Sequence, residues 1–177
     1  MLTKLSAKDW VSAGLRALAR DGFTALKADI LAGKLGVSRG SFYWHFADVA
    51  AFEDAVMQHW RDVMAEAIIR DLERLAPREH LGDLLRCTFS TDPSLESAMR
   101  AWASADGRAQ ALVAAVDRRR LSYIERMLDD AGVAAAQVRS RAQILYWTYL
   151  GFVQTGKPIS GKARDRLIDQ IVAFVSF

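Results

Sequence analysis

The sequence predicts an all-α protein of about nine helices. Apolar residues recur every three or four positions through most of the 177-residue chain, which is the spacing of a helix that buries one face. No run of alternating apolar and polar residues lies between turn residues, as a strand would require. Pro and Gly stand instead between the helical segments, where they interrupt helices.

The first part of the chain contains four expected helices. The first helix is expected at about residues 7–20. Ser6 and Asp9 have the spacing of a capping box at its start, and Asp21-Gly22 ends it. The others are expected at about residues 27–34, at about 39–45 with Ser38 as N-cap, and as one long helix from Asp48 to Pro77.

The second part of the chain keeps the helical spacing and adds five expected helices. Pro or Gly stands at or between their ends, where either residue punctuates a helix. The helices are expected at about residues 79–89, 93–104, 107–131, 135–155 and 161–176.

Positive charge is concentrated near the N-terminus. Residues 1–47 contain seven Lys or Arg and three Asp, a balance of +4, whereas the whole chain carries +3, which leaves the remainder at −1. This distribution is expected if the N-terminal segment faces phosphate and the remainder does not. We predict a first domain at residues 1–48 and a second domain at residues 49–177. The two domains meet in the long fourth helix without a flexible linker.

Residues 37–46, Val-Ser-Arg-Gly-Ser-Phe-Tyr-Trp-His-Phe, indicate a surface that reads a partner. They combine hydrogen-bond donors at an expected helix start with a run of aromatic and imidazole groups. Just upstream, Gly36 permits a sharp turn, and the small Ala32 lets two helices approach closely. Together these features predict a helix-turn-helix.

This segment is similar to the helix-turn-helix signature of TetR-family transcriptional regulators. The resemblance covers about residues 7–56. It implies a head of three DNA-binding helices and a body of about six helices that binds a small molecule and forms a homodimer. The matching residues are Leu31-Ala32, Gly36-Val37-Ser38, Gly40-Ser41, Phe42-Tyr43 and His45-Phe46.

The resemblance and the side-chain chemistry together assign roles within the head. Arg39 and Ser41 can donate to base edges or phosphates, and Gly40 would let the helix start approach DNA closely. Tyr43 and His45 can donate to phosphate oxygens, which sets the register without reading sequence. The predicted DNA-binding residues are Lys27, Ser38, Arg39, Gly40, Ser41, Tyr43, Trp44 and His45.

Two positions depart from the usual pattern. Many family members carry a Lys at the start of the fourth helix, where this chain has Val49, so that phosphate contact is expected to be missing. Gly33 lies inside the second helix, where Gly costs about 1 kcal/mol relative to Ala.

Large, soft side chains in the body are candidates for the lining of an effector pocket. Pockets for small ligands are mostly apolar with a few polar groups. Each of these residues is more often plain core, and the sequence identifies no particular effector. The candidates are Trp60, Met64, Phe89, Met99, Trp102, Tyr123, Met127, Tyr146 and Trp147.

The last two helices are expected to form a homodimer, as their family counterparts do. The helix at residues 135–155 carries more apolar surface than one side can bury. No apolar run approaches the ~20 residues that span a membrane, and the N-terminus lacks the apolar core of a signal peptide. Cys87 has no internal disulfide partner, which favours the cytoplasm.

Two other classes of function remain as alternatives. The three histidines lie in different segments without metal-ligand spacing, and no Gly-rich phosphate loop is present, so no enzyme, cofactor or metal site is predicted. A protein–protein adaptor would keep the apolar body but would not need a basic head. We predict a TetR-like regulator, by family tendency a repressor, that binds a palindromic operator as a dimer and is released by a small-molecule effector.

Overall fold

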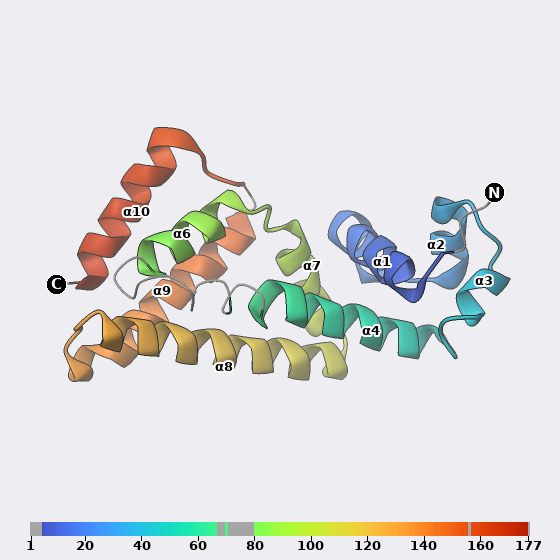
Figure 1. The fold of residues 1–177 in the computed structure, drawn as a ribbon, viewed down its shortest axis with the longest axis horizontal. Coiled ribbons are helices and arrows are strands. Elements are labelled where there is room, and N and C mark those ends of the chain that lie inside the picture. Colours follow the sequence, from blue (N-terminus) through green and yellow to red (C-terminus); the bar gives the residue numbers. More distant parts are fainter. Residues whose placement is uncertain (1–4, 67–69, 71–79, 156, 177) are drawn as a thin grey trace. The chain divides into compact units, whose positions relative to one another are not determined.

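The computed structural model describes residues 5–66, 70, 80–155 and 157–176, and within this part the chain is helical and contains no strand (Figure 1). The predicted all-α fold is therefore confirmed. The α-helices are α1 (Ala7–Asp21), α2 (Ala28–Leu35), α3 (Gly40–Tyr43), α4 (Val49–Arg61), α6 (His80–Ser90), α7 (Ser94–Ala103), α8 (Gly107–Asp130), α9 (Ala135–Thr155) and α10 (Gly161–Ser176).

Two predicted helices differ from the structure. α4 gives way after Arg61 to a π-helical segment, η2 (Asp62–Glu66), so the expected α-helix is interrupted there, and most of its predicted remainder up to Pro77 lies outside the described residues. α3 is shorter than expected, and Arg39 rather than Ser38 takes its N-cap position. Ser38 contributes its backbone carbonyl, which accepts from the N–H of Ser41 at 3.0 Å.

The chain folds into two compact units. One consists of Met1–Val63 with Ser94–Val113, and the other of Met64–Pro93 with Ala114–Phe177. α7 and the start of α8 therefore belong to the same unit as the N-terminal helices. The predicted division at residue 48 concerns where DNA binds, and it stays a prediction.

α1 begins and ends as its sequence indicates. The Ser6 backbone N–H donates to Asp9 Oδ2 at 2.7 Å, and Ser6 Oγ accepts from the Asp9 backbone N–H at 3.4 Å, which completes the capping box. The hydrogen bond from the Ser6 backbone N–H, with a second from Ser6 Oγ to Asp9 Oδ2 at 2.7 Å, lowers the pKa of Asp9. At the other end, Gly22 adopts φ +79°, a conformation that a side chain would disfavour.

An ion pair ties the last turn of α1 to α2. The carboxylate of Asp21 lies 2.5 Å from Lys34 Nζ and 3.1 Å from Arg20 Nε. The hydrogen bonds from Arg20 and Lys34 lower the pKa of Asp21 to about 2. Two of the seven N-terminal cations are thus already paired within the protein.

A buried aromatic cluster holds α3 against α1 and α4. Phe42 is fully buried, and its ring centroid lies 5.3 Å from those of Trp10, Phe46 and Phe52. Most of these pairs are edge-to-face, the arrangement that favours contacts between ring quadrupoles. The position of the short helix α3 is therefore fixed by a core that α1, α3 and α4 share.

α1 and α4 approach closely at Gly14. A Cβ atom at this position would lie 2.7 Å from Phe52 Cζ and 2.9 Å from Val56 Cγ2, and both of those side chains are fully buried. Such distances leave no room for a methyl group. The local sequence around Gly14 does not predict this role, because it does not reveal a neighbour about 40 residues away.

Alanine at Gly14 and at Gly33 should have opposite effects on stability. Gly14→Ala is expected to lower the free energy of unfolding by about 1–3 kcal/mol because it overpacks the α1–α4 contact. Gly33→Ala is expected to raise it by up to about 1 kcal/mol, since a Cβ there meets nothing within 4 Å. Urea denaturation of both variants measures the change in the free energy of unfolding. Changes of the same sign in the two variants would contradict this packing.

The C-terminal unit has its own core, formed by α6, α8, α9 and α10. Phe89 packs edge-to-face on Phe152, and its carbonyl accepts from the N–H of Ile159 at 2.9 Å, which ties the α9–α10 connection to α6. Inside this unit, Tyr146 donates its hydroxyl to Asp117 at 2.5 Å. No helix among the described residues has the length and hydrophobicity to cross a membrane.

Candidate nucleic-acid interface

All of the predicted DNA-binding residues except Lys27 lie in the turn between α2 and α3, in α3 or immediately after it. Gly36 makes this turn possible, because it adopts φ +67° and so lets the N–H of Val37 reach the carbonyl of Ala32 at 3.1 Å. The chain then enters α3 directly. The fold thereby places Ser38, Arg39 and Gly40 on the surface.

The aromatic run in this segment divides into an inward and an outward set. Phe42 and Phe46 are buried in the aromatic cluster, whereas Tyr43 is 45% and Trp44 is 85% exposed. Exposure of a whole indole ring is unusual, because it leaves a large apolar area in water. Trp44 is therefore available to a partner and contributes little to the fold.

Arg39 and Tyr43 contact each other on this surface. Arg39 Nη2 donates to Tyr43 Oη at 3.1 Å, and its guanidinium carbon lies 5.6 Å from the centroid of the Tyr43 ring. The hydrogen bond from Arg39 to Tyr43 also raises the pKa of Arg39. The i, i+4 spacing of the two residues on a helix is the sequence signal that predicts such a contact.

The protein interior gives no reason for glycine at position 40. A Cβ there would meet only Ser38 Oγ, at 3.7 Å, which is an ordinary contact distance. Its φ is not positive, so the backbone does not require glycine either. Ser41 and His45, by contrast, are only partly exposed.

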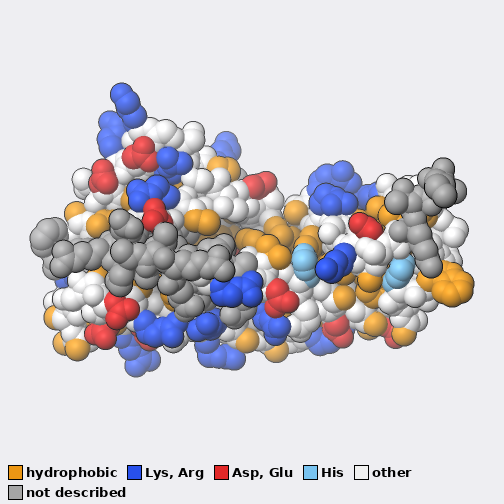
Figure 2. All heavy atoms as spheres, in the orientation of Figure 1, with side chains coloured by type: hydrophobic (Ala, Val, Ile, Leu, Met, Phe, Trp, Pro, Cys, Tyr) orange, Lys and Arg blue, Asp and Glu red, His pale blue; other side chains and the backbone are white. Residues whose placement is uncertain are grey.

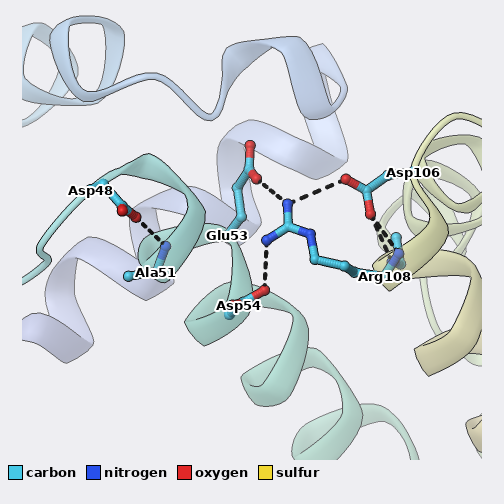
Figure 3. Close-up of polar contacts among 7 residues, drawn as sticks. Asp48, Ala51, Glu53, Asp54, Asp106 and Arg108 are labelled. Carbon is cyan, nitrogen blue, oxygen red and sulfur yellow. Dashed lines mark hydrogen bonds and ion pairs between the residues drawn. The ribbon is translucent and has the colours of Figure 1, made fainter.

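Two helix starts flank this surface. Lys27 is exposed and holds the N-cap position of α2, whose first turn has no side-chain cap. At α4, Asp48 Oδ1 accepts from the N–H of Ala51 at 2.7 Å, so a carboxylate already occupies this helix start (Figure 3). Val49, at the place of the usual family Lys, is partly buried.

Positive and negative side chains are interspersed on the face of the molecule that Figure 2 shows. Figure 2 shows Lys and Arg mixed with Asp and Glu over the visible face, rather than one continuous basic area. Among the described residues, no group of three or more His, Cys, Asp or Glu could hold a metal ion.

The predicted pocket residues are divided between the two units. Most of them are buried in one of the two cores, Met64 is partly buried, and Trp147 is 63% exposed in the isolated chain. Their assignment to an effector pocket stays a prediction. Trp60, Met99 and Trp102 lie in the N-terminal unit; Met64, Phe89, Tyr123, Met127, Tyr146 and Trp147 lie in the C-terminal unit.

The N-terminal helices match a known family of DNA-binding proteins. Residues 11–52 match the family model for bacterial regulatory proteins of the tetR family. The match runs from α1 to the start of α4 and includes every residue predicted to bind DNA. No curated protein sequence gives a significant match to the chain.

Solved structures resemble nearly the whole chain, and at their low identities they establish its fold. The reduced form of E. coli NemR is 17% identical over 96% of this chain and 95% of its own, with a TM-score of 0.76. A Clostridium perfringens protein described as a fatty acid metabolism regulator is 19% identical over 96% of both chains, with a TM-score of 0.70. BioQ with its natural double-stranded DNA operator is 24% identical over 97% of this chain and 98% of its own, with a TM-score of 0.51.

Proposed function

The chain is a TetR-type DNA-binding regulator whose tetR-family domain lies at residues 11–52, and from this premise we propose that it binds a palindromic operator as a homodimer. The observation that carries the proposal is the exposed surface of α3. There, Arg39, Tyr43 and Trp44 project from a segment that Phe42 and Phe46 anchor in the core. Because the backbone that carries these side chains is already fixed, it does not have to be ordered when DNA binds.

In the proposed complex, residues 1–48 contact the duplex. Arg39 and Ser41 read base edges in the major groove, with Gly40 close to the DNA and Ser38 beside it. Tyr43, Trp44 and His45 contact the sugar–phosphate backbone, and Lys27 binds a phosphate at the start of α2. BioQ, whose structure contains its double-stranded DNA operator, supports duplex DNA as the partner.

An exposed apolar surface on the last two helices supports a homodimer. On α9, Ile144 is 38% and Trp147 is 63% exposed, and on α10, Leu167 is 36% and Phe174 is 67% exposed. Each pair has a spacing that puts both residues on one face of its helix, at i, i+3 and i, i+7. Burial against a second copy would remove this surface from water, and a pair of heads suits a palindromic site.

We further propose that the protein is a repressor in the cytoplasm, where bacterial DNA lies, and that a small molecule bound by residues 49–177 releases it from DNA. Two helices make such coupling possible. α4 leads from residues 37–46, the reading segment, into η2. α8 begins in the N-terminal unit and continues in the C-terminal unit. A ligand that favours one arrangement of these helices would shift the population that binds DNA.

The test begins with selection from a pool of randomised duplexes by the full-length protein. The expected product is an inverted repeat with half-sites about 10 base pairs apart, and it should bind two copies of the chain. Affinity should fall steeply with salt, because each phosphate contact contributes about −0.9 to the slope of log K against log salt. A scrambled duplex is the control, and no enrichment, or binding that is indifferent to salt, would favour a protein–protein adaptor.

A further inference from the structure

Arg108, at the start of α8, joins two distant parts of the N-terminal unit (Figure 3). Its Nη2 lies 2.6 Å from Glu53 Oε2, its Nη1 lies 2.8 Å from Asp54 Oδ1, and Nη2 also lies 3.3 Å from Asp106 Oδ2. Glu53 and Asp54 belong to α4 and lie 55 and 54 residues away from Arg108 in the sequence, respectively. A single guanidinium thus binds three carboxylates through its fixed fork of donors.

Asp106 fixes the direction of this arginine. Its Oδ1 accepts from the N–H groups of Arg108 at 2.8 Å and of Ala109 at 3.0 Å, so it caps α8 while its Oδ2 contacts the guanidinium. The hydrogen bond from Ala109 is the main reason that the pKa of Asp106 is lowered. The helix start and the arginine side chain are therefore held together.

α4, which carries the other two carboxylates that contact Arg108, begins shortly after the reading segment. Asp48 caps α4, and Glu53 and Asp54 follow within its next turn and a half. Phe52 and Val56 pack on α1 at Gly14, so apolar contacts hold one side of α4. The ion pairs to Arg108 hold α4 to α8 through a second, independent set of contacts.

We infer that Arg108 is a positioning residue for operator binding: by joining α4 to the start of α8, it fixes the direction in which α4 leaves the reading segment. α8 begins in the N-terminal unit and ends in the C-terminal unit, which carries the helices of the proposed dimer. A fixed α4 then sets the separation of the two α3 helices, and so the half-site spacing that the dimer accepts. This inference rests on the proposed function.

The contacts suit positioning better than stability. All four side chains are partly exposed, and exposed ion pairs add little to the free energy of folding. Removal of the arginine should leave the fold intact. It should instead let α4 adopt a wider range of orientations relative to α8, because the ion pairs of Arg108, each of them weak, together restrict that orientation.

The test compares Arg108→Gln with Arg118→Gln in the full-length protein. Arg118 is an exposed residue of the same helix in the other unit, so it controls for the lost charge. Each variant is titrated with the selected operator and with the same duplex carrying one extra base pair between the half-sites. Arg108→Gln should bind the operator up to about tenfold more weakly and lose most of the preference for the correct spacing, whereas Arg118→Gln should match the wild type.

A second variant tests the partners. Glu53→Gln combined with Asp54→Asn should reproduce the loss of spacing preference, and adding Arg108→Gln should change it no further, because all three residues act through one set of contacts. An unaltered spacing preference in Arg108→Gln, or simple additivity in the triple variant, overturns the inference.

Hydrogen exchange separates a failure of this inference from a failure of the proposed function. Without DNA, the α4 amides near Phe52 should exchange faster in Arg108→Gln than in Arg118→Gln. If the wild type selects no duplex, the proposed function fails and the role in operator binding fails with it. Unchanged exchange overturns the tie between α4 and α8 whether or not DNA binds.

Discussion

Phe42→Ala is expected to lower the free energy of unfolding of the N-terminal unit by about 3–5 kcal/mol. Phe42 is fully buried and contacts the rings of Trp10, Phe46 and Phe52, so the substitution removes the centre of the aromatic cluster. Domains are usually stable by about 5–15 kcal/mol, so a loss of this size leaves much of the unit unfolded under mild denaturation. Urea titration of the full chain, followed by tryptophan fluorescence, measures the loss.

Trp44→Ala is the matched control in the same segment. Trp44 is 85% exposed, so its removal should change the free energy of unfolding by no more than about 0.5 kcal/mol. It should still weaken binding to operator DNA, because the indole is proposed to contact the DNA backbone. Equal destabilisation by the two alanines would contradict the division of the aromatic run into an inward and an outward set.

Arg39→Ala is expected to weaken operator binding by about 1–3 kcal/mol and to relax the preference at one base pair in each half-site. Tyr43→Phe should instead weaken binding to all duplexes alike, because a phosphate contact carries no sequence information. Titration of the selected operator and of its single-base variants separates the two effects.

The contact between Arg39 and Tyr43 adds a further expectation. Because Arg39 Nη2 donates to Tyr43 Oη, either single substitution already removes this hydrogen bond. The double variant should then deviate from additivity by about 0.5 kcal/mol or more. Strict additivity would show that the two side chains act independently on DNA, and a full set of wild-type affinities would refute both assigned roles.

The sequence predicts the fold class and most helix boundaries because their signals are local. The capping box of Ser6 and Asp9 and the left-handed Gly36 each act within a few residues of where they stand. The pairing of α7 with α1 has no such signal. It depends on contacts between segments about 80 residues apart, which helical periodicity does not encode.

The candidate site likewise contains residues that the sequence reveals and residues that it does not. The exposed residues of α3 stand out from the sequence because their chemistry clusters in one short segment. The pocket candidates do not, because a large apolar side chain has the same spacing whether it fills a core or lines a cavity. Arg108 was missed since its partners in α4 are 54 and 55 residues away. Glu96 lies one turn before Arg100 and 2.8 Å from it, a contact that the i, i+4 spacing predicts, but nothing in the sequence indicates that this carboxylate is buried.

The opposite orientations of the aromatic residues in residues 42–46 have a consequence for the evolution and redesign of specificity. Phe42 and Phe46 carry the structural role, whereas Tyr43, Trp44 and the neighbouring Arg39 are exposed. Exchange of the outward residues therefore costs little stability, and new operator preferences are accessible through single substitutions. A library randomised at the outward positions, with both phenylalanines retained, would consist largely of folded proteins and could be screened directly for altered DNA preference.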